Sequence, residues 1–167
     1  LDIDASYIMR CLFEAKSNVK QISLRALVFK TELPKSINVP ASLISLNVSQ
    51  CTFHSTVFKS FIEVLTSRLL PTPILLSAQS LVMKDDIYAG LAGLNFASLA
   101  PNLCEIDFSG NGFATSSMKY FFAFLCTQSR MHLLSLNDVY TDNTVAFLSS
   151  VSTLVKERNL CGLEISG

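Results

Sequence analysis

The sequence predicts an α/β solenoid: a curved, right-handed coil of about six units, with short parallel strands on the inner face and helices on the outer one. A spaced apolar triplet returns six times along the 167 residues. Between its copies, the apolar spacing changes from that of a strand to that of a helix. Half of the residues are apolar and only 16% are charged, which suits units whose apolar faces are covered by their neighbours.

The triplet has the form apolar, two residues, apolar, one residue, apolar, which suits a short strand with alternate side chains pointing inward. Its copies begin at Val19, Leu43, Pro73, Leu103, Met131 and Leu160. The successive offsets are 24, 30, 30, 28 and 29 residues. The copy at Pro73 is the weakest, so we expect the coil to be irregular over residues 70–84. Leu1 and Ile3 form a half-unit before the first full copy.

Helical apolar spacing separates the strands. Three amphipathic segments lie at residues 57–65, 118–125 and 145–155. The third should begin near Asp142–Thr144, where oxygen-bearing side chains can cap a helix. A fourth helix is expected over Asp86–Ser98, and the short unit after Phe29 is expected to be poor in helix.

Several copies of the triplet continue with a turn position and one more apolar residue. The fullest reads Leu103-Cys-Glu-Ile106-Asp-Phe108-Ser-Gly-Asn111-Gly-Phe113, and another runs from Leu43 to Cys51. These segments resemble the leucine-rich-repeat superfamily, and the long units resemble its ribonuclease-inhibitor subtype. The resemblance implies one leucine-rich-repeat domain over residues 1–167, taken from a longer protein. The turn position departs from the family's Asn or Cys at Leu27, Leu81 and Val139.

Two groups within that superfamily are the most similar. The strand Leu103–Asn111 and the Phe-rich segment Phe121–Leu125 resemble the repeats of CARMIL-type actin-capping-protein regulators. The long, irregular units also resemble the repeat regions of NLR-type immune sensors. The first resemblance implies a scaffold or adaptor in cytoskeletal regulation, and the second implies an innate-immune regulatory domain.

The residues between the inward positions should line up in columns on the inner face. One column reads Ser23, Asn47, Ser77, Asp107, Ser135, Glu164; its neighbours read Arg25, Ser49, Gln79, Ser109, Asn137, Ser166 and Gln21, Ser45, Leu75, Glu105, Leu133, Gly162. The candidate protein-binding residues are Arg25, Asn47, Gln79, Glu105, Asp107, His132, Leu133, Asn137 and Glu164. This polar face suits an extended or helical segment of another protein. The alternative is a solvated sheet, with binding elsewhere.

Catalytic chemistry has two weak candidates. Cys104 and His132 occupy matching positions on neighbouring strands, and a Cys–His pair can serve as a nucleophile or a metal site. Glu105 and Asp107 share one face of a strand, as paired acids do in acid–base catalysis. Gly110-Asn-Gly112 lacks the lysine and spacing of a phosphate-binding loop. A half-buried rim of small side chains explains these residues better, so we expect no enzyme, no cofactor and no metal site.

Several partner classes are disfavoured. Lys and Arg form no cluster that would suit nucleic acid, and no apolar run reaches the roughly 20 residues of a membrane span. The five cysteines are odd in number and form no C-x-x-C pair, which favours a reducing, cytoplasmic location. The expected partner is another protein. The alternatives are self-association through open repeat ends and, more remotely, activation of a GTPase.

Overall fold

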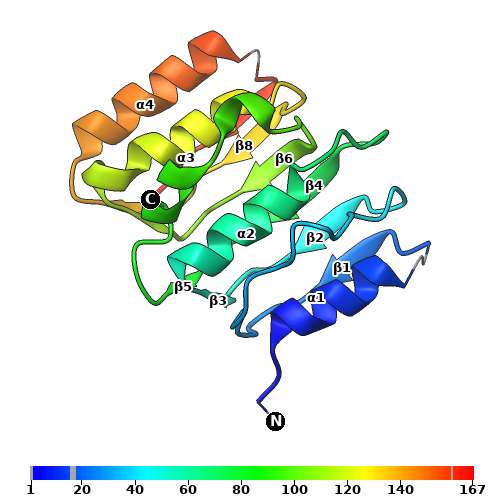
Figure 1. Ribbon diagram of the computed structural model, residues 1–167. Helices are drawn as coiled ribbons and strands as arrows, with labels where there is room; N and C mark the ends of the chain where they lie inside the picture. Colours follow the sequence, from blue (N-terminus) through cyan, green and yellow to red (C-terminus); the bar gives the residue numbers. More distant parts are fainter. Residues whose placement is uncertain (1, 16–17, 159) are drawn as a thin grey trace.

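The computed structural model describes residues 2–15, 18–158 and 160–167. It shows a mixed α/β fold around a six-stranded parallel sheet, in which the strands follow one another in chain order (Figure 1). The strands are β1 (Gln21–Ser23), β2 (Ser45–Asn47), β4 (Ile74–Ser77), β6 (Leu103–Asp107), β8 (Leu133–Ser135) and β10 (Gly162–Glu164). Each triplet thus forms one strand, including the weak copy at Pro73.

The strand register confirms two of the predicted columns. Gln21, Ser45, Leu75, Glu105, Leu133 and Gly162 are successive partners across the sheet, as are Ser23, Asn47, Ser77, Asp107, Ser135 and Glu164. The irregularity expected around residues 70–84 is confined to a bulge between Ile74 and Leu75, where β4 meets β6.

Four α-helices lie on one face of the sheet (Figure 1). They are α1 (Ala5–Glu14), α2 (Ser55–Leu65), α3 (Thr115–Thr127) and α4 (Thr144–Glu157). The last three confirm the predicted helical segments, and α4 begins at an Asn143 side chain that accepts a hydrogen bond from the Ala146 amide. Helix α1 was not predicted. It begins two residues after Ile3 of the expected half-unit, and Asp4 between them forms an isolated parallel bridge with Val28. Leu1 of that half-unit lies outside the described residues.

The fourth predicted helix, Asp86–Ser98, is wrong. That segment forms two short 3-10 helices, η1 (Ala89–Gly93) and η2 (Phe96–Ser98). A Cβ added to Gly90 would lie 2.5 Å from the carbonyl oxygen of Ser55, so the backbone of η1 approaches α2 more closely than an ordinary side chain allows. The unit after Phe29 contains no α-helix between residues 30 and 44, as expected.

Two short parallel pairs lie where the chain leaves the main sheet. β3 (Thr52–Phe53) pairs with β5 (Val82–Met83), and β7 (Gly112–Phe113) pairs with β9 (Tyr140–Thr141). They hold the turns of successive units in parallel and direct each chain segment toward the helix side.

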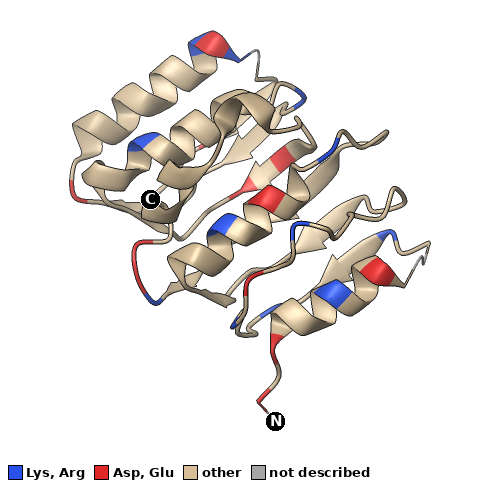
Figure 2. Ribbon diagram, in the orientation of Figure 1, with Lys and Arg blue, Asp and Glu red and all other residues tan. Residues whose placement is uncertain are grey.

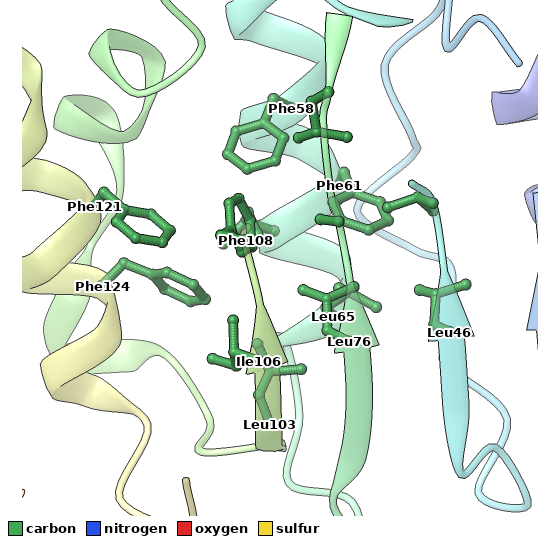
Figure 3. Packing of buried hydrophobic residues seen from close by; sticks show 14 of the residues in the cluster. Leu46, Phe58, Phe61, Leu65, Leu76, Leu103, Ile106, Phe108, Phe121 and Phe124 are labelled. Carbon is green, nitrogen blue, oxygen red and sulfur yellow. The ribbon is translucent and has the colours of Figure 1, made fainter. Parts of the chain in front are cut away.

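The core fills the space between the sheet and the helices (Figure 3). Phe108, directly after β6, packs between Phe58 of α2 and Phe121 of α3, with ring centroids 6.3 and 4.8 Å away. Phe113 and Phe147 extend this aromatic chain to α4. Every unit therefore shares apolar contacts with the next one, while Leu163 on β10 stays 39% exposed.

Candidate interaction surface

The sheet has one face that no described helix covers, and we call it the open face. Along the five strands from β1 to β8, apolar residues such as Leu46 and Ile106 point to the helices and are buried. The residues between them point the other way. The open face consists of the three predicted columns, which begin at Gln21, Ser23 and Arg25 and end at Gly162, Glu164 and Ser166.

Backbone pairing continues beyond the ends of the strands and supports the third column. The amide of Ala26 donates to the carbonyl of Ser49, and the amide of Gln50 donates to that of Gln79. The same contact recurs in the later units. One residue per unit there takes a positive φ: Ala26, Gln50, Ser80, Gly110 and Asp138, between 49° and 72°. Only one of the five is glycine, so the sequence carried little signal of this repeated turn.

The turn position that follows joins neighbouring units through side chains. The Asn111 amide nitrogen donates to the carbonyls of Ala78 and Phe108 at 2.8 and 2.7 Å, and its oxygen accepts from the Leu81 amide at 2.9 Å. The thiol of Cys51 donates to the carbonyl of Leu24. Both side chains are buried, so each satisfies backbone groups that the bend leaves open.

Polar side chains on the open face hydrogen-bond across strands. The hydroxyls of Ser49 and Ser77 lie 3.0 Å apart, and the Gln79 side chain donates to Asp107. Asp107 also accepts from the Ser109 amide at 3.0 Å. These contacts hold the middle of the face in one arrangement.

A second set of contacts orders the part of the face near the last strand. The hydroxyl of Ser135 donates to Glu164 at 2.6 Å, and the hydroxyl of Ser166 donates to Asn137 at 3.1 Å. The Ser109 hydroxyl accepts from the Asn137 amide at 3.0 Å. The polar face therefore presents fixed side chains rather than freely rotating ones.

The candidate catalytic pairs receive little support from their surroundings. The His132 ring nitrogen lies 3.2 Å from a Glu105 carboxylate oxygen, so the imidazole has a carboxylate partner. Burial raises the pKa of the Cys104 thiol, and the negative charge of Glu105 raises it further, which disfavours the reactive thiolate. Among the described residues, no three His, Cys, Asp or Glu side chains gather closely enough to hold a metal ion.

The open face contains a shallow depression of about 240 Å³. Leu75 and Leu133 stand on either side of Glu105, one strand away in each direction. Asp107 and Ser135 also line it. A Cβ added to Gly162 would lie only 2.7 Å from a methyl carbon of Leu133, so the glycine leaves room for that leucine.

The structure places eight of the nine candidate residues in the columns of the open face; these are Arg25, Asn47, Gln79, Glu105, Asp107, Leu133, Asn137 and Glu164. His132 precedes β8 and reaches the face through its contact with Glu105. Leu75 lies in a predicted column and lines the depression, although it is not one of the nine candidate residues. The apolar character of Leu75 in a polar column was the available signal.

Comparisons of the chain with protein-family models, with curated proteins and with solved structures found no match. Within the part of the chain that the structure describes, no helix has both the length and the apolar character needed to cross a membrane.

Proposed function

We propose that the chain is a leucine-rich-repeat solenoid and that its open face is a non-catalytic docking surface for another protein. The repeat assignment is supported by the one-strand-per-unit sheet, by the positive-φ residue repeated in five turns and by the side-chain contacts of Cys51 and Asn111. The strands and the positive-φ residues return at the spacing of the triplet, and Cys51 and Asn111 occupy the same position in two of the units.

The observation that carries the function is the open face itself. It extends across six parallel strands, no described element covers it, and cross-strand hydrogen bonds order its side chains. A preordered surface loses less side-chain entropy on binding than a mobile one. The depression between Leu75 and Leu133 adds apolar contact area to an otherwise polar surface. A scaffold or adaptor role fits this combination.

Site-specific photo-crosslinking tests this function. A crosslinking amino acid at Asn47 or Asn137 lies on the open face, and one at Lys119 lies exposed on α3, on the helix side. We expect crosslinked partner proteins from the first two positions in cell extract and none from Lys119. The double variant Glu105→Arg, Asp107→Arg should remove those crosslinks, because it reverses the charge at the centre of the face. Crosslinks from Lys119 alone would move the binding site to the helices.

A further inference from the structure

The strands of the main sheet carry charge of one sign. Glu105, Asp107 and Glu164 are the charged residues within the six strands, and no Lys or Arg lies in any of them. Figure 2 shows the acidic positions on β6 and no basic position on the strands beside it. The net charge of the whole chain is zero. Arg25 gives the open face a positive charge beside β1, so the acidic excess lies from β6 onward.

Within the described residues, no Lys or Arg side chain pairs with these carboxylates, and the basic partner of Glu105 is the His132 ring nitrogen, 3.2 Å away. Among the described residues, the ion pairs that involve Lys or Arg are Arg10–Glu14, Lys30–Asp2 and Lys59–Glu63. Arg130, two residues before His132 in the turn that precedes β8, donates to the carbonyls of Leu70 and Pro71 at 2.8 and 3.2 Å. It is thus engaged away from the strands.

Apolar side chains flank the central carboxylate. Leu75, Glu105 and Leu133 are partners on three adjacent strands, which places successive residues about 4.8 Å apart. Both leucines are half-buried and line the depression with Asp107. A side chain entering here would meet aliphatic surface on two sides and carboxylate oxygens in the middle.

We propose that the occupant of this depression is an arginine-bearing basic segment of a partner protein. The guanidinium group is planar and weakly hydrated, so it can lie against leucine side chains while it donates two parallel hydrogen bonds to a carboxylate. Neighbouring basic residues of the segment would face Asp107 and Glu164. A lysine fits less well, because its ammonium group is compact and strongly hydrated. This inference rests on the proposed function of the open face.

Selection from a library of random short peptides displayed on phage tests this chemistry without knowledge of the natural partner. We expect the peptides retained by the protein to be enriched in arginine beside apolar residues, relative to the starting library. Replacing arginine by lysine in a selected peptide should weaken its binding several-fold, and replacing it by glutamate should abolish binding. A retained pool without arginine enrichment, or no retained pool at all, would overturn the proposal.

Fluorescence anisotropy with one selected peptide locates the binding site. The double variant Glu105→Gln, Asp107→Asn keeps the shape of both side chains and should weaken binding about tenfold. Leu75→Ser with Leu133→Ser should weaken it by a similar factor. The matched control Glu32→Gln, Glu63→Gln removes two negative charges outside the open face and should leave binding unchanged. Equal loss in the control would indicate non-specific attraction and overturn the assignment.

The two proposals fail separately. If crosslinks form from Asn47 and Asn137 but arginine-bearing peptides do not bind, the open face is a docking surface for a partner of different chemistry. If no crosslinks form from the open face, the proposed function fails, whatever the peptides do.

Discussion

The side chain of Asn111 joins two neighbouring units. It is 1% exposed, and its amide group makes three hydrogen bonds to backbone atoms of its own unit and the preceding one. Removing the amide leaves a buried N–H and two buried carbonyls without these partners. Such groups cost free energy because they lose water without gaining a replacement.

We therefore expect Asn111→Ala to lower the free energy of unfolding by about 3 kcal/mol. Urea denaturation followed by circular dichroism measures this. Asn111→Cys should cost less, because a thiol at the equivalent position of an earlier unit, Cys51, donates to a backbone carbonyl. Asn95→Ala, at an exposed position, is the control and should change stability by less than about 0.5 kcal/mol. Equal losses for the Ala and Cys variants would contradict the bridging role.

At the scale of elements, two helices are capped by the unit that follows them. The residues that precede α2 and α3, His54 and Ala114, provide no side-chain cap. Instead Asp85 accepts from the amide and the hydroxyl of Ser55, both at 2.7 Å. Asp142 accepts from the amide of Thr115 at 2.9 Å and from its hydroxyl. The helix ends thus depend on contacts between units as well as on local sequence.

The Asp142 cap makes stability depend on pH. Hydrogen bonds from the Thr115 hydroxyl, and then from its amide, hold the pKa of Asp142 below its ordinary value. A carboxyl whose pKa is lowered on folding stabilises the fold above its unfolded pKa, and this contribution is lost as the pH falls through the folded pKa. We expect Asp142→Ala to lower the melting temperature at neutral pH, and the difference from wild type to shrink as the carboxyl is protonated.

Thermal melts of both proteins between about pH 7 and pH 3 follow this change. Asp142→Asn is the matched variant, because its amide oxygen still accepts hydrogen bonds but carries no charge. Its deficit at neutral pH should be smaller than that of Asp142→Ala, and it should also shrink as the wild-type carboxyl is protonated, because neither variant titrates at residue 142. A deficit of Asp142→Ala that stays constant down to the acid end of the range would contradict the capping role of the charged form.

The elements also show where sequence reasoning succeeded and failed. The strands and three helices were predictable because their apolar spacing is set by the geometry of the element. The spacing of Ala5, Ile8, Met9 and Leu12 also indicates α1, but this signal is separate from the strand triplet. The prediction of a helix at residues 86–98 was wrong because Gly90 approaches Ser55 closely, and such a contact between distant parts of the chain is not visible in the apolar spacing. The columns followed from the repeat, whereas the depression depends on Gly162 making room for Leu133.

At the scale of the whole molecule, stability is passed from each unit to the next. The aromatic core forms a chain rather than a central cluster: Phe29 contacts Phe53 and Phe61, with centroids 4.4 and 5.9 Å away. At the other end, Phe147 contacts Phe113 and Phe122 at 5.8 and 5.9 Å. A protein built this way should respond to a core substitution locally, because each unit is stabilised mainly by its own neighbours.

Hydrogen exchange tests this local response. Phe147→Ala creates a cavity under α4, which should speed amide exchange in β8 and β10 by at least about tenfold and leave β1 and β2 unchanged. Phe29→Ala should do the reverse, so each variant serves as the control for the other. In wild type, amides of the central strands β4 and β6 should exchange most slowly, because these two strands lie farthest from the edges of the sheet. If either variant speeds exchange equally in all six strands, the domain opens as one cooperative body and the nearest-neighbour account is wrong. The open face would then hold its shape only while the entire sheet is folded, and a substitution at either end would weaken binding at the central depression as much as one beside it.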